Sequence, residues 1–141
     1  MEAGYRNFEI YRLSHALAMK VHEMSLKLPK FEMHEVGSQI RRSAKSVPAN
    51  IVEGYALRKW KNEYVHFLCR AYASSEETLQ HLEMLHATKS LTDDRLYQEL
   101  QEEYKKLNRM LFAFVKSVAE THESPSFLKE PEEPYNLNLE P

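Results

Sequence analysis

Two short stretches of the sequence gather positive charge, and the second also contains an aromatic ring; these are residue types that bind nucleic acid. Together they contribute seven residues: Arg41, Arg42 and Lys45, followed by Arg58, Lys59, Trp60 and Lys61. Lys and Arg side chains neutralise phosphates, and an aromatic side chain offers a surface on which a base can stack. Both stretches are therefore candidate contacts for RNA or another nucleic acid.

The charge balance of the chain weakens this interpretation. Nucleic-acid-binding domains commonly have an isoelectric point above about 9, whereas the value for this sequence is about 6.4. Residues 1–119 carry 18 Lys and Arg against 15 Asp and Glu, a net charge of +3, and residues 120–141 carry a net charge of −5. Two alternatives stay open. Glutamates of the same chain could pair with Arg41 and Arg42, and the acidic tail could compete with RNA for the basic surface.

The histidines and the single cysteine form no pattern that predicts an enzyme. Glu63 with His66, and Glu83 with His86, have the Glu-x-x-His spacing of a carboxylate-bridged metal site, which needs this motif from two helices. Here both motifs fall on one expected helix, about 30 Å apart at 1.5 Å per residue. The sequence contains no HExxH motif and no glycine-rich phosphate loop, and Cys69 is expected to pack within a helix. We expect no catalytic residue, no metal and no cofactor.

The hydrophobic pattern predicts the elements that position these residues. Apolar residues that recur every three or four positions predict four amphipathic helices, at about 9–28, 35–56, 61–88 and 92–120. Thr92 is a suitable N-cap for the last of them, which has the most regular apolar seam: Leu96, Leu100, Tyr104, Leu107, Leu111, Phe114 and Val118. Short connections between such helices favour an all-α, antiparallel up-down-up-down four-helix bundle over residues 1–120. Residues 121–141 form an acidic, proline-rich tail that is expected to be disordered, although its apolar residues could bind a protein partner.

The second predicted helix contains a proline near its centre. Pro48 removes the hydrogen bond to the carbonyl of Ala44, at a cost of about 3 kcal/mol. Ser46 and Asn50 could satisfy freed backbone groups, and Gly54 allows another helix to approach closely. Beside its apolar stripe, this helix has a second stripe of small or polar residues: Ser43, Ser46, Asn50 and Glu53. Two stripes indicate two packing partners, so we expect a contact with another subunit.

Residues 38–56, SQIRRSAKSVPANIVEGYA, resemble the signature of the 23S rRNA intervening-sequence protein family, also called four helix bundle proteins. The matching positions are Ser38, Arg41, Arg42, Ser46, Pro48, Asn50, Ile51, Glu53, Gly54 and Tyr55. Residues 64–82 resemble a second family segment at Tyr64, Phe67, Leu68, Ala71, Ser74 and Glu77. The resemblance makes the following residues candidates for the contact between subunits: Ser46, Pro48, Asn50, Glu53, Gly54 and Glu77.

The resemblance implies a bacterial, non-enzymatic protein that assembles into a ring, usually a homopentamer. Many members are encoded inside intervening sequences of 23S rRNA genes. Related accessory proteins of diversity-generating retroelements bind a reverse transcriptase and nucleic acid. We therefore expect an oligomeric binding or scaffold module associated with RNA or a ribonucleoprotein. The alternatives are a protein-only interaction module and an accessory subunit of a retroelement reverse transcriptase.

The composition also gives an expectation for the cellular compartment. The sequence contains no run of 18 apolar residues, so no membrane span is predicted. Its first residues lack the apolar segment of a secretory signal, and one cysteine cannot form an internal disulfide. We expect a cytoplasmic protein without a membrane partner.

Overall fold

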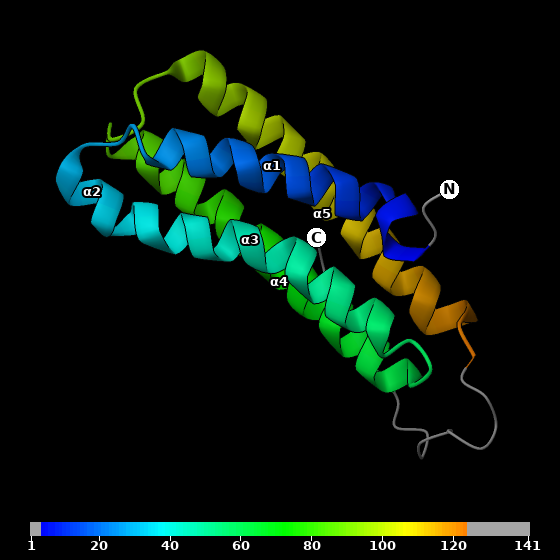
Figure 1. Ribbon diagram of the computed structural model, residues 1–141. Helices are drawn as coiled ribbons and strands as arrows, with labels where there is room; N and C mark the ends of the chain where they lie inside the picture. Colours follow the sequence, from blue (N-terminus) through cyan, green and yellow to red (C-terminus); the bar gives the residue numbers. More distant parts are fainter. Residues whose placement is uncertain (1–3, 124–141) are drawn as a thin grey trace.

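The computed structural model describes residues 4–123, which contain helices and no strand. A short 3-10 helix and five α-helices follow one another with these bounds: η1 Gly4–Asn7, α1 Glu9–Ser25, α2 Lys30–His34, α3 Val36–Ala56, α4 Lys61–Ala87 and α5 Asp94–Thr121. The four long helices α1, α3, α4 and α5 run in alternating directions along the molecule (Figure 1). The prediction of an all-α, antiparallel four-helix bundle is therefore confirmed. The predicted tail reaches beyond Glu123, and residues 124–141 lie outside the described residues.

The structure differs from the prediction at two helix boundaries. The first helix ends at Ser25, and the next residues turn more tightly, with the Lys27 N–H donating to Met24 O (3.1 Å). This change agrees with Pro29, because the residue before a proline avoids the helical conformation. At the start of α5 the N-cap is Asp93, not Thr92, because the Asp93 carboxylate accepts the Leu96 N–H (3.0 Å).

The short helix α2 occupies what was predicted as a linker, and a buried carboxylate connects it to two other segments. Glu32 is 6% exposed. Its Oε1 accepts the Val36 N–H (3.3 Å) at the start of α3, and its Oε2 accepts the Ser90 hydroxyl (2.7 Å) in the α4–α5 connection. Gly37 permits this arrangement, because a Cβ there would lie 2.8 Å from the Glu32 carbonyl oxygen. Glu32 thus satisfies an N-terminal donor of α3 and joins α2 to the connection before α5.

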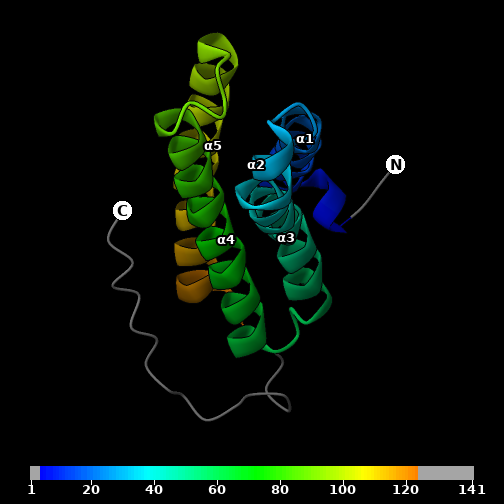
Figure 2. The ribbon, with the colours of Figure 1, turned by 90° about the vertical axis from the view of Figure 1, so that its left-hand side faces the viewer.

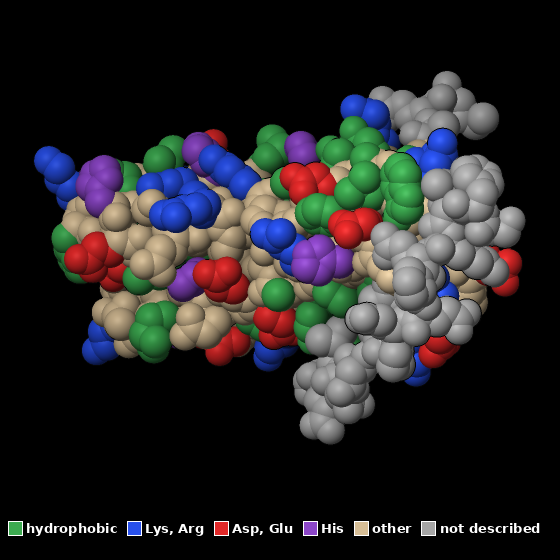
Figure 3. All heavy atoms as spheres, turned by 90° about the horizontal axis from the view of Figure 1, so that it is seen from below, with side chains coloured by type: hydrophobic (Ala, Val, Ile, Leu, Met, Phe, Trp, Pro, Cys, Tyr) green, Lys and Arg blue, Asp and Glu red, His purple; other side chains and the backbone are tan. Residues whose placement is uncertain are grey.

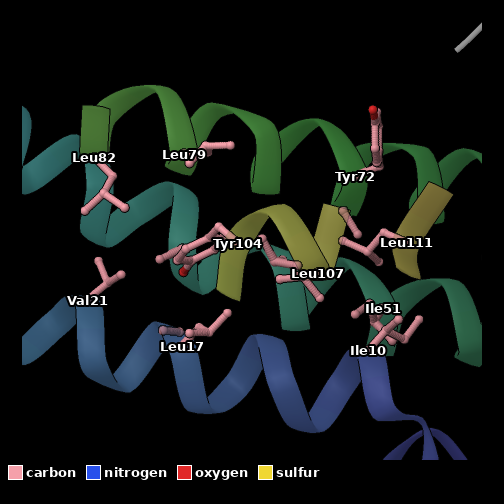
Figure 4. Close-up of a cluster of buried hydrophobic side chains, with 14 of the residues drawn as sticks. Ile10, Leu17, Val21, Ile51, Tyr72, Leu79, Leu82, Tyr104, Leu107 and Leu111 are labelled. Atoms are coloured by element: carbon pink, nitrogen blue, oxygen red, sulfur yellow. The ribbon is translucent and has the colours of Figure 1, made fainter. Parts of the chain in front are cut away.

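The core runs the length of the bundle, between the four long helices (Figure 4). Its largest fully buried side chains are Leu17, Val21, Ile40, Val47, Ile51, Leu68, Leu82, Leu85, Leu100, Tyr104, Leu107 and Leu111. Burial of one such side chain contributes about 1.5–3 kcal/mol. In residues 4–123 no helix is long and apolar enough to cross a membrane.

Helices α3 and α4 share the most extensive contact of the bundle, and they lie side by side in Figure 2. Near the C-terminus of α3, a Cβ on Gly54 would lie 3.2 Å from the Phe67 Cβ, so glycine allows the close approach that the sequence predicts. Farther along, hydroxyl groups bridge the two helices: Thr78 Oγ1 donates to Ser43 Oγ (2.8 Å). The connection between α3 and α4, which carries the cations around Trp60, lies at one end of the bundle (Figure 1).

Candidate nucleic-acid interface

The connection between α3 and α4 shares its end of the molecule with η1 and the C-terminus of α5 (Figure 1). Arg58 folds back onto the last turn of α3, where its Nη1 donates to Tyr55 O (2.9 Å). Its guanidinium carbon lies 4.1 Å from the centroid of the Tyr55 ring, a cation–π arrangement. Both contacts hold the Arg58 side chain in place while it stays exposed to solvent.

Helix η1 and the first turns of α1 add two arginines that sequence reasoning missed. The guanidinium carbon of Arg6 lies 4.7 Å from the Tyr5 ring centroid, and the Tyr5 and Tyr55 rings meet edge to face at 6.0 Å. Arg12 extends the group from the first turns of α1, because its Nε donates to Arg6 O (2.9 Å). A continuous chain of contacts therefore joins Arg58 to Arg6 and Arg12.

Gly4 allows η1 to lie this close to α3. Its φ is +84°, in the left-handed region that favours glycine. A Cβ at this position would lie 3.1 Å from Cε1 of the Tyr55 ring. Any larger residue would therefore strain the backbone and displace η1 from Tyr55.

We define the arginine end as the four exposed cations Arg6, Arg12, Arg58 and Lys59. None of the four forms an ion pair with another residue in the range 4–123. Their positive charge is therefore not neutralised by a paired carboxylate of that range. Trp60 is half-buried beside them, and its backbone begins α4 by accepting the Tyr64 N–H (2.9 Å). Lys61 is half-buried and already engaged in an interaction.

The other predicted group of cations separates into two kinds. Arg41 is half-buried, and its guanidinium donates to Ser25 Oγ (3.0 Å) and to Met33 O (2.9 Å). These partners are neutral oxygens, so Arg41 connects α1 and α2 to α3 and forms no ion pair within residues 4–123. Arg42 and Lys45 are exposed on α3. Figure 3 shows one face of the molecule, where several Lys and Arg side chains gather toward the end away from the grey residues and others lie singly beside acidic and His side chains. Arg42 and Lys45 therefore remain a second candidate surface, on α3.

The comparisons with known proteins agree with this architecture. A family model described as "23S rRNA-intervening sequence protein" matches residues 6–113. The chain belongs to this family. A solved structure of a protein with unknown function from the S23 ribosomal protein family of Bacteroides thetaiotaomicron has the same fold, with a TM-score of 0.64 and 24% identity over 76% of this chain and 95% of that one. The comparison with curated proteins returns no match.

In this intervening-sequence protein, two polar residues of the family signature, Ser46 and Asn50, form hydrogen bonds within one chain. Ser46 Oγ lies 2.9 Å from Ser74 Oγ, and the Asn50 amide donates to Ser46 O (2.8 Å) and Ser46 Oγ (2.9 Å). Asn50 therefore binds the carbonyl of Ser46 and not that of Ala44, although α3 continues unbroken through Pro48.

Burial divides the predicted subunit contacts of this 23S rRNA-intervening sequence protein into two groups. Pro48, Asn50 and Gly54 are buried inside the single chain. Glu53 and Glu77 are exposed, and Glu77 Oε1 lies 3.3 Å from the His81 ring. A contact between subunits stays a prediction for all six residues, including the half-buried Ser46, and the buried Pro48, Asn50 and Gly54 also pack within the bundle.

The described part of the intervening-sequence protein contains no group of three or more side chains placed to bind a metal. His86, from one of the Glu-x-x-His motifs, instead stacks on Tyr97 with ring centroids 3.7 Å apart and contacts Asp94 Oδ1 (2.8 Å). Burial raises the pKa of the Cys69 thiol, which disfavours the reactive thiolate. The family description names no enzymatic activity.

Proposed function

We propose that this 23S rRNA-intervening sequence protein is a non-enzymatic, oligomeric binding module of the cytoplasm that contacts RNA through the arginine end. The observation that carries the proposal is the convergence of Arg6, Arg12 and Arg58 around Tyr5 and Tyr55 without an ion pair in residues 4–123. A planar guanidinium can donate two parallel hydrogen bonds to a phosphate. The guanidinium groups of Arg6, Arg12 and Arg58 are exposed to solvent, where a phosphate could contact them.

The chemistry of the arginine end favours single-stranded RNA over a regular duplex. Phosphates would bind the exposed cations, and a base freed from stacking could pack on an aromatic side chain such as Trp60. A sequence-tolerant contact of this kind needs no base-specific pocket.

Assembly into an oligomer would compensate for the small charge of one chain. Residues 1–119 have a net charge of only +3. In a homo-oligomer, for which the family resemblance favours a pentameric ring, the arginine ends would act together. Linked weak sites gain affinity through a high effective concentration and need no new contact.

The first test is light scattering on a sizing column, with absorbance recorded at 260 and 280 nm. We expect a mass that is a multiple of the 16.6 kDa chain, near five copies, with excess absorbance at 260 nm from bound RNA. A multimer that contains no RNA and binds none when RNA is added would favour the protein-only module. A monomer would contradict the oligomeric part of the proposal.

Replacement of two cations tests the surface itself. We expect R58Q/K59Q to weaken binding of a single-stranded RNA about tenfold or more at low salt. The slope of log K against log salt should fall by about 0.7 for each lost phosphate contact. Fluorescence anisotropy of a labelled oligonucleotide measures both quantities. The control is K105Q/K106Q, which removes two exposed cations from α5.

Two checks separate this result from unfolding and from a non-specific charge effect. The melting temperature and the oligomer mass of R58Q/K59Q must stay near those of the parent chain, because Arg58 also bonds Tyr55 O. An equal loss of affinity in K105Q/K106Q, or unchanged binding in R58Q/K59Q, would place the RNA contact elsewhere.

A further inference from the structure

The residue that follows α5, His122, contacts the connection that carries Arg58 and Lys59 of the arginine end. His122 Nε2 lies 2.6 Å from Arg58 O, and its ring meets the Tyr64 ring edge to face at 5.1 Å. These contacts join the end of α5 to the connection between α3 and α4. Residues 124–141 therefore begin two residues beyond His122, whose side chain contacts the backbone of Arg58.

The sequence that follows has the opposite charge to the arginine end. Residues 124–141 contain Glu130, Glu132, Glu133 and Glu140 against a single Lys129, a net charge of −3. An extended chain spans up to about 3.6 Å per residue, so the Glu130–Glu133 group can reach any point within about 25 Å of Glu123. A covalent attachment this short gives an effective concentration of the order of millimolar.

We propose that residues 124–141 bind the arginine end of their own chain and compete there with RNA. The tail carboxylates then provide the anionic partners that Arg6, Arg12, Arg58 and Lys59 lack in residues 4–123. The competition with RNA rests on the proposed function, whereas the contact between tail and arginine end does not. RNA would bind fully only where its phosphates displace the tail.

The contact is electrostatic, and this gives it a salt signature. Exposed charges interact over about 10 Å at an ionic strength of 0.1 M and over about 3 Å at 1 M. The tail should therefore occupy the arginine end at low salt and leave it at high salt. A docking driven by the apolar residues of the tail would have the opposite salt dependence or none.

Trp60 reports on this contact without any RNA. It is the only tryptophan of the chain and directly follows Lys59. Iodide is an anionic quencher that concentrates near positive charge, so its quenching of Trp60 fluorescence measures how far the arginine end is neutralised. The test compares the full chain with a chain of equal length in which Glu130, Glu132, Glu133 and Glu140 are replaced by Gln. At an ionic strength of about 0.1 M we expect roughly twofold stronger iodide quenching in the substituted chain, and no difference at about 1 M.

Two controls make the result specific to the tail. The first replaces four exposed glutamates of the bundle by Gln and should leave iodide quenching of Trp60 near that of the full chain: Glu23, Glu35, Glu83 and Glu102. The second adds R58Q/K59Q to the tail substitution and should abolish the gain in quenching. Equal iodide quenching in the full chain and the tail-substituted chain at low salt would overturn the proposal.

Parallel RNA titrations distinguish failure of the tail contact from failure of the proposed function. If both ideas hold, the tail-substituted chain binds single-stranded RNA about three- to tenfold more tightly than the full chain at low salt. If iodide quenching changes as expected but neither chain binds RNA, the tail contact stands and the proposed function fails. If both chains bind RNA equally and quench equally, the proposed function stands and the tail contact is wrong.

Discussion

Replacement of Tyr104 by alanine is expected to lower the free energy of unfolding by about 3–5 kcal/mol, the largest effect of any single change considered. The Tyr104 side chain is 0% exposed and lies at the centre of the core, between α5 and the other long helices (Figure 4). Truncation to alanine leaves a cavity that packed helices can fill only in part. Replacement of Tyr104 by phenylalanine should instead raise the free energy of unfolding.

The second half of this prediction depends on the hydroxyl. Among the described residues, Tyr104 Oη has no hydrogen-bond partner. A buried hydroxyl without a partner costs about 1–3 kcal/mol, so Tyr104→Phe is expected to raise the free energy of unfolding by about 1 kcal/mol. Urea unfolding measures both changes as shifts of the midpoint at constant slope.

A tyrosine on the same helix supplies the matched control. Tyr97 is half-buried near the start of α5, and its hydroxyl accepts a hydrogen bond from Gln101 Nε2 (3.0 Å). Tyr97→Phe should therefore change stability by less than about 0.5 kcal/mol, or lower it slightly. If Tyr104→Phe were as destabilising as Tyr104→Ala, the hydroxyl would have a stabilising partner and the argument would be wrong.

Much of this core could be predicted from the sequence, because helical periodicity decides which residues face inward. Leu100, Tyr104, Leu107 and Leu111 are buried as the seam of the last helix predicts. At one position near the C-terminus the seam was wrong, since Val115 is buried and Phe114 only half-buried, whereas Val118 is buried as predicted. A seven-residue pattern assumes 3.5 residues per turn, whereas a straight helix has 3.6, so the buried face drifts.

The candidate site was predictable only in part, because it depends on contacts between distant segments. Local composition pointed to Arg58 and Lys59, but nothing in the sequence near Arg6 indicates that Tyr5 packs against Tyr55. The composition also did not indicate that Arg41 is half-buried whereas Arg42 is exposed. Neighbours on a helix point about 100° apart, and here this turns Arg41 toward Ser25 and leaves Arg42 in solvent. Charge can be counted from a sequence, whereas its accessibility requires the fold.

The protein is expected to lose stability steeply above pH 10. Burial raises the pKa of Tyr64 to about 12, with a further upward contribution from Tyr55 and a downward one from Arg58. Burial also raises the pKa of Tyr104. In the unfolded chain both phenols ionise near pH 10. Between pH 10 and 12 the unfolded state therefore releases protons that the folded state retains, and the free energy of unfolding falls as the pH rises.

The size of this effect follows from the shift at Tyr64. One pKa unit corresponds to about 1.4 kcal/mol, so Tyr64 alone should contribute about 2–3 kcal/mol of lost stability between pH 10 and 12. Urea unfolding at pH 8 to 12 measures the loss. The variant Y64F/Y104F removes both phenols, so its free energy of unfolding should fall less between pH 10 and 12. The variant Y97F should follow the parent chain more closely, because Tyr97 is less buried.

The loss of stability above pH 10 also tests whether Arg58 of the arginine end acts on the buried Tyr64. Arg58 lowers the pKa of Tyr64 through its positive charge. R58Q should therefore raise the folded-state pKa of Tyr64 further, and its stability should fall more steeply than that of the parent chain between pH 10 and 12. Lys and the remaining ionisable groups lose protons in the same range, so the decisive quantity is the difference between R58Q and R58Q/Y64F. If the two variants had identical pH profiles, Tyr64 would not be the group through which the arginine end affects the stability of the bundle.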